Sequence, residues 1–99
     1  MPGLDRKAQK AEAALSRRMR EAYEAQDWEG LKSIASAVVG TLPQHPDLCF
    51  EAHLNLESAE IGIAVKQDPD NLHIAYIRQA HRSLRMLKPR AVRGYGIYR

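Results

Sequence analysis

Residues 47–67, DLCFEAHLNLESAEIGIAVKQ, form the most apolar stretch of the chain and decide its fold. Two apolar stripes run along it at spacings of three and four residues, one formed by Leu48, Ala52, Leu56, Ala59 and Ile63 and the other by Phe50, Leu54, Ile61 and Val65. Side chains at these spacings share a face of an α-helix. Because two adjacent apolar stripes must be covered from more than one side, this stretch is predicted to be the central helix of a small bundle.

Two helices are predicted before this central one. Apolar residues at helical spacing indicate an amphipathic helix over residues 4–26. Asp27 is a suitable N-cap for a second helix at residues 28–40, and Trp28 would lie at the closed end of the resulting hairpin. The sequence TLPQHP at residues 41–46 contains two prolines and is predicted to be a loop.

A last helix is predicted at residues 70–88, after a start signal in which Asp68 is the cap and Pro69 lies in the first turn. Pro89 is expected to break or kink it and to leave a short basic tail at residues 89–99. No strand pattern is present. The sequence therefore predicts an all-α fold, a single domain built as a small antiparallel bundle of four helices with a short basic C-terminal segment.

Charge is distributed unevenly along the 99 residues, although the net charge is only +3. Residues 1–20 carry six Lys or Arg and two acids, residues 21–70 carry two Lys and ten acids, and residues 71–99 carry seven Lys or Arg and no acid. Such asymmetry is typical either of basic segments lying against an acidic middle or of a basic face offered to an acidic partner.

The location and redox state follow from what the sequence lacks. A single cysteine excludes an internal disulfide. The N-terminal residues contain no unbroken apolar run of the secretory kind, and no segment reaches the roughly 20 apolar residues that span a bilayer. We therefore expect a cytoplasmic protein that does not insert into membranes.

Metal binding and catalysis are not favoured. His45, Cys49 and His53 are each four residues apart, but a structural zinc site needs four ligands, and Cys49 is better explained as a small buried residue. No serine lies in a G-x-S-x-G turn and no Walker-type loop is present. We expect no catalytic residue, no metal and no cofactor.

Two binding alternatives were weighed against the residues. Residues 71–99 are basic and contain Tyr76, Tyr95 and Tyr98, a combination that can pair with phosphates and stack on bases, but the acidic middle would repel nucleic acid. A tetratricopeptide-like unit is disfavoured because the 34-residue period fails.

Both ends of the helical region resemble one family. The start of the second helix, Asp27-Trp28-x-x-Leu31, and the ending LRMLKPRAVRGYGIY at residues 84–98 resemble FliT-like flagellar export chaperones. In that family a cation, small or branched apolar residues, a tyrosine and a final aromatic close the chain at similar spacing, as Arg90, Val92, Tyr95 and Tyr98 do here. Pro89 departs from the smoother last helix of the family.

The resemblance implies a small cytoplasmic helical chaperone that binds the C-terminal region of the filament-cap protein for flagellar type III export. In the family the last helix can cover the client groove. The predicted partner-binding residues are Leu48, Ala52, Leu56 and Ile63 in the groove, Val92, Tyr95, Ile97 and Tyr98 in the cover, and Arg82, Arg85, Arg90 and Arg93 as selectors of acidic partners.

A competing interpretation is a small basic helical inhibitor or regulator, associated with a mobile element or with nucleic acid, that acts by binding a larger complex. In either case the apolar stripes would pack in the core, pair two copies of the chain, or receive a helical client. The sequence does not distinguish these uses.

Overall fold

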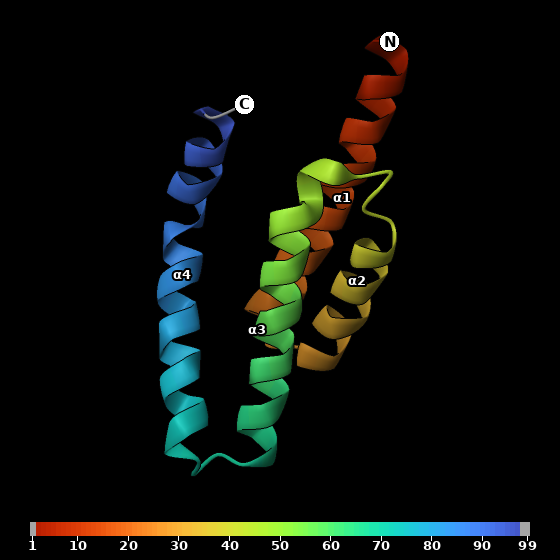
Figure 1. Cartoon of the computed structure of the whole chain (residues 1–99). Helices are drawn as coiled ribbons and strands as arrows, with labels where there is room; N and C mark the ends of the chain where they lie inside the picture. Colours follow the sequence, from red (N-terminus) through yellow and green to blue (C-terminus); the bar gives the residue numbers. More distant parts are fainter. Residues whose placement is uncertain (1, 98–99) are drawn as a thin grey trace.

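Four antiparallel α-helices make up the fold, with α3 placed between α4 on one side and the α1–α2 pair on the other (Figure 1). The computed structural model describes the backbone of residues 2–97 and the side chains of residues 6, 7 and 9–87. The elements are α1 (Pro2–Glu24), α2 (Trp28–Gly40), the short 3-10 helix η1 (Pro46–Leu48), α3 (Cys49–Gln67) and α4 (Leu72–Ile97). No strand occurs in residues 2–97. The predicted all-α bundle of four helices is confirmed.

A tight turn joins α1 to α2. Gln26 has a φ of 56°, and backbone hydrogen bonds from Gln26 N to Tyr23 O (3.0 Å) and from Asp27 N to Ala22 O (2.9 Å) close the end of α1. This is the Schellman pattern, in which a left-handed residue reverses the chain. Asp27 then caps α2, since its Oδ1 accepts from Gly30 N at 3.1 Å. The predicted N-cap is confirmed.

The apolar core lies between α1, α2 and α3. Its buried members are Met19 from α1, Leu31, Ala35 and Val38 from α2, Leu48 from η1, and Ala52 and Ala59 from α3. Among the described side chains, none from α4 belongs to this core. The prediction that the central helix is covered from more than one side is confirmed, because α3 contacts all three other helices.

The base of the α1–α2 hairpin packs tightly on α3 at Gly62. A Cβ atom built at Gly62 would overlap the Trp28 ring system. Trp28 also meets Tyr23 edge to face, with ring centroids 5.6 Å apart. The indole therefore fills the space that a side chain at residue 62 would need, and α2 and α3 make close contact at this glycine.

We expect Gly62→Ala to lower the free energy of unfolding by about 1–3 kcal/mol, because overlap with Trp28 outweighs the gain in helix propensity. Urea unfolding followed by circular dichroism measures the change. Gly40→Ala is the matched control, since Gly40 ends α2 with nothing within 4 Å of its Cβ position. A Gly62→Ala protein as stable as the Gly40→Ala protein would contradict this account of the contact.

The last helix differs from the prediction at both ends. Asp68 is the C-cap of α3, and α4 begins at Leu72 because Asn71 Oδ1 accepts from the backbone nitrogens of His73 (3.0 Å) and Ile74 (3.2 Å). Pro69 is therefore not in the first turn of α4. At the other end α4 continues through Pro89 to Ile97.

The predicted break at Pro89 and the separate tail are thus wrong for residues 89–97. A proline inside a helix costs about 3 kcal/mol, because it lacks one N–H donor and crowds the preceding turn. The helix nevertheless runs from Leu72 through Pro89 to Ile97. Residues 98 and 99 lie outside the described part of the chain.

Candidate protein-binding site

Three polar side chains and one apolar side chain form the row that attaches α4 to α3. Ile74, Arg78, His81 and Arg85 recur at spacings of four, three and four, and all four are half-buried. Side chains at these spacings share one helix face. This face meets α3 at Asn55 and Ser58, which are both buried. The described part of the α3–α4 interface therefore places buried polar groups beside the apolar Ile74, whereas the core between α1, α2 and α3 is apolar.

Arg85 is the centre of this interface. Its Nη1 donates to Asn55 Oδ1 at 2.8 Å and to Ser58 Oγ at 3.1 Å. Its guanidinium carbon lies 3.6 Å from the centroid of the Tyr23 ring, a cation–π contact with α1. Burial lowers the pKa of Arg85, while the nearby Tyr23 and Glu51 raise it. An arginine stays charged under all ordinary conditions, so this cation is compensated by dipoles, a ring face and a nearby carboxylate.

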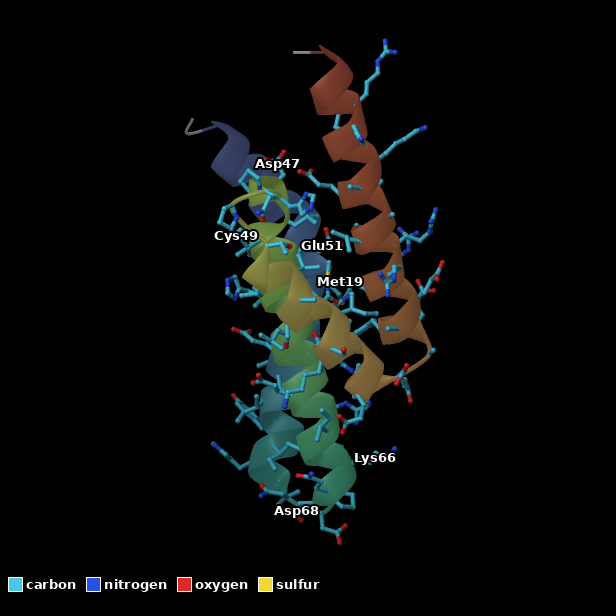
Figure 2. All side chains as sticks on the ribbon, turned by 90° about the vertical axis from the view of Figure 1, so that its right-hand side faces the viewer. Met19, Asp47, Cys49, Glu51, Lys66 and Asp68 are labelled. Carbon is cyan, nitrogen blue, oxygen red and sulfur yellow. The ribbon has the colours of Figure 1, made fainter. Side chains whose placement is uncertain are left out.

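Asn55 is held in one orientation by its other contacts. Its Nδ2 donates to Glu51 O at 2.9 Å and approaches Met19 Sδ at 3.7 Å. Because the amide nitrogen is engaged on these two acceptors, the amide oxygen points at Arg85. Ser16 of α1 donates to Glu51 Oε1 at 2.5 Å. Glu51 points from α3 toward α1 in Figure 2. The polar cluster therefore connects α1, α3 and α4.

His81 forms the second polar contact of α4. Its Nδ1 lies 3.2 Å from Ser58 Oγ and its Nε2 lies 3.3 Å from Glu57 Oε2. The pKa of His81 lies below its ordinary value of 6.5, because desolvation by burial outweighs the raising effect of Glu57, and the positive charge of Arg85 lowers it further. The imidazole is therefore neutral in the folded protein at pH 7.

We expect Arg85→Met to cost about 2 kcal/mol or more, because it leaves Asn55 Oδ1 buried without its donor and removes one of the partners of Ser58 Oγ. Hydrogen exchange should show faster exchange of α4 amides, with those of α2 little changed. Arg82→Met is the control: Arg82 is exposed on the same helix, and its replacement should change stability by about 0.5 kcal/mol at most. Equal effects of the two variants would show that Arg85 does not attach α4.

The lowered pKa of His81 predicts a pH dependence. The unfolded chain binds a proton at His81 near pH 6.5, whereas the folded protein binds it only at lower pH. The neutral form of His81 therefore contributes its full share to the free energy of unfolding above pH 6.5, and this share is lost as the pH falls through the folded pKa. His81→Gln should flatten the fall in unfolding free energy between about pH 7 and pH 5. His73→Gln, at an exposed histidine, should leave the fall unchanged. Identical profiles for all three proteins would exclude the effect.

The predicted partner-binding residues whose side chains the structure describes do not come together as one site. Leu48 and Ala52 lie in the core, with 4% and 0% of their surface exposed. Leu56 is half-buried against that core. Ile63 lines a different pocket, with Trp28, Glu29 and Lys66 near the α1–α2 turn. The predicted groove along this stripe is therefore occupied by α1 and α2, because the hairpin covers this face of α3.

The predicted arginines are also separated. Arg85 points inward and is engaged on Asn55 and Ser58. Arg82 is exposed and, with Arg78, lines two pockets, one beside Tyr23 and Trp28 and the other beside Asp68 and Asn71. The remaining predicted residues have no described side chains, namely Arg90, Val92, Arg93, Tyr95, Ile97 and Tyr98.

Exposed apolar side chains gather on α4, and the sequence analysis did not single them out as a binding face. The large apolar residues exposed in the described part of the chain all belong to this helix, namely Leu72, Tyr76, Ile77, Leu84, Met86 and Leu87. Ile77, Ala80, Leu84 and Leu87, spaced by three, four and three, form what we call the α4 seam. Beside it, an open groove of about 420 Å³ is lined by Ile61, Ile77, Ala80 and Leu84, with Glu57, Glu60 and His81.

The spacing of Ile77, Leu84 and Leu87 was visible in the sequence, but nothing there showed that this face would stay uncovered. The sequence did not show that a different face of α4 would pack on α3, the face on which Arg85 and His81 contact Asn55 and Ser58. The available indication was polar spacing: Asn55 and Ser58 are three residues apart on the most apolar helix. His81 and Arg85 are four residues apart on the last helix and could meet them.

Within the described residues, no group of three or more His, Cys, Asp or Glu side chains is placed to hold a metal ion. Cys49, expected to be buried, is exposed, because Leu48 takes the core position before it and Cys49 points away from α1 (Figure 2). None of the described helices combines the length and apolar character that a bilayer span requires.

Comparison of the chain with family models, with curated proteins and with solved structures finds no match. The resemblance to FliT-like chaperones therefore stays a prediction.

Proposed function

We propose that this protein is a non-catalytic binding protein, a chaperone or adaptor, that receives an amphipathic helix of another protein on the α4 seam. One observation carries the proposal. Leu84 and Leu87 of the seam are 41% and 52% exposed, although α4 has an α3-facing side on which they could have been buried. Contiguous exposed apolar surface on a small domain is typical of protein–protein interaction.

The geometry suits a helical client. A helix lays apolar residues at positions i, i+3, i+4 and i+7 into a groove between two helices, and affinity comes from burial without any chemical step. The seam and the neighbouring Ile61 supply such a groove between α3 and α4. If the resemblance is correct, the client is the C-terminal segment of the filament-cap protein, bound before flagellar type III export.

The nucleic-acid alternative is less well supported at this face. Glu57 and Glu60 border the groove, and their charges would repel a phosphate backbone. The exposed Arg82 does not line this groove but lines two other pockets, one of which adjoins it at Ile61 and His81.

We expect the filament-cap C-terminal segment to bind the full chain in isothermal titration calorimetry, and Leu84→Asp to weaken binding at least about tenfold by placing a charge in the apolar contact. Met86→Asp is the matched control, since Met86 is 83% exposed and does not line the groove. No binding to the full chain and none after deletion of residues 89–99 would contradict this client. Equal loss in both Asp variants would contradict the position of the site.

A further inference from the structure

The groove beside the α4 seam has an acidic border. Glu57 and Glu60 are three residues apart on α3, are both exposed, and line the groove together with Ile61. Glu57 approaches His81 Nε2 at 3.3 Å but keeps 62% of its side chain exposed. His81 is neutral at pH 7 because its pKa is lowered, so it does not cancel either carboxylate.

Among the described side chains, no Lys or Arg lines this groove. Arg85 is engaged on Asn55 and Ser58. Arg78 and Arg82 line two other pockets, one of which adjoins this groove at Ile61 and His81. The α4 seam therefore faces solvent beside two carboxylates, even though the chain carries a net charge of +3. Opposite charges across an interface speed encounter and fix register, whereas like charges placed together cost several kcal/mol.

The seam itself specifies a helix as the occupant. Spacings of three, four and three are those of the a and d positions of a coiled coil, in which the flanking e and g positions carry the charges that select the partner. Glu57 and Glu60 border one side of the seam and would meet one flank of a docked helix.

We infer that the partner segment is an amphipathic helix with Lys or Arg along the flank that faces Glu57 and Glu60. The inference rests on the proposed function and names the chemistry of its client. A second copy of α4 fits this groove less well as the partner. Its Arg78 is half-buried and its Arg82 is exposed, and both lie on a different side of the helix from Leu84. The acidic border also differs from the expectation that arginines of this protein select an acidic partner.

Two designed helical peptides test the inference. They share one leucine seam at a and d positions, and one carries Lys and the other Glu along a single flank. Fluorescence anisotropy with the full chain at low salt should show the Lys peptide binding at least about tenfold tighter than the Glu peptide, with the difference shrinking as salt screens the charges.

Charge reversal on the protein should reverse this preference. The double variant Glu57→Lys/Glu60→Lys should bind the Glu peptide more tightly than the Lys peptide. The control Glu24→Lys/Glu29→Lys makes the same charge change at exposed positions away from this groove, and it should keep the preference of the unmodified protein. Glu60→Lys alone should weaken the preference, which keeps the test valid if Glu57→Lys disturbs His81.

The outcomes separate this inference from the proposed function. Equal affinity for both peptides, or tighter binding of the Glu peptide, would contradict the inference that the partner helix has a cationic flank. The proposal that the seam binds a helix would remain. No binding of either peptide would overturn both. A homodimer in sedimentation that Leu84→Asp dissociates would also overturn the inference, since the seam would then belong to a second copy of the chain.

Discussion

A half-buried arginine on the last helix must be matched by groups on the other helices, and this requirement shapes the α3–α4 interface. A guanidinium removed from water is tolerated only where its donors find acceptors. Asn55 and Ser58 supply two acceptors from α3, and Tyr23 supplies a ring face from α1. Because three helices contribute to this contact, the position of α4 is fixed by polar geometry.

This polar attachment leaves the apolar residues of α4 uncovered. In an ordinary bundle the apolar stripe of each helix faces the core, and the charged face is solvated. Here Arg85 and His81 take the face toward α3, and Leu84 and Leu87 are turned toward solvent. The arrangement leaves exposed apolar area on α4 that the contact with α3 does not bury.

Local signals predicted the frame of the fold, and they failed where long-range contacts decide. The cap at Asp27 was predictable, because a capping residue acts within one turn. The packing of Trp28 on Gly62 joins residues far apart in the sequence, and only the structure identifies it. The start of α4 was misplaced because Asp68 and Asn71 are both good caps, and only their hydrogen bonds distinguish them. Leu48 was predicted to face a partner but lies in the core, because an apolar stripe does not reveal what covers it.

Ile61 and Ile63 show this limit within a single helix. Both are half-buried isoleucines on α3, yet Ile63 lines the pocket near the α1–α2 turn and Ile61 lines the groove beside α4. Charge shows the same limit, since the composition is basic and suggests an acidic partner, whereas the groove beside the exposed apolar side chains is bordered by Glu57 and Glu60. Opposite charges attract only within about 10 Å at moderate salt. The charge that a docked helix meets is therefore that of the nearest side chains, and here those are carboxylates.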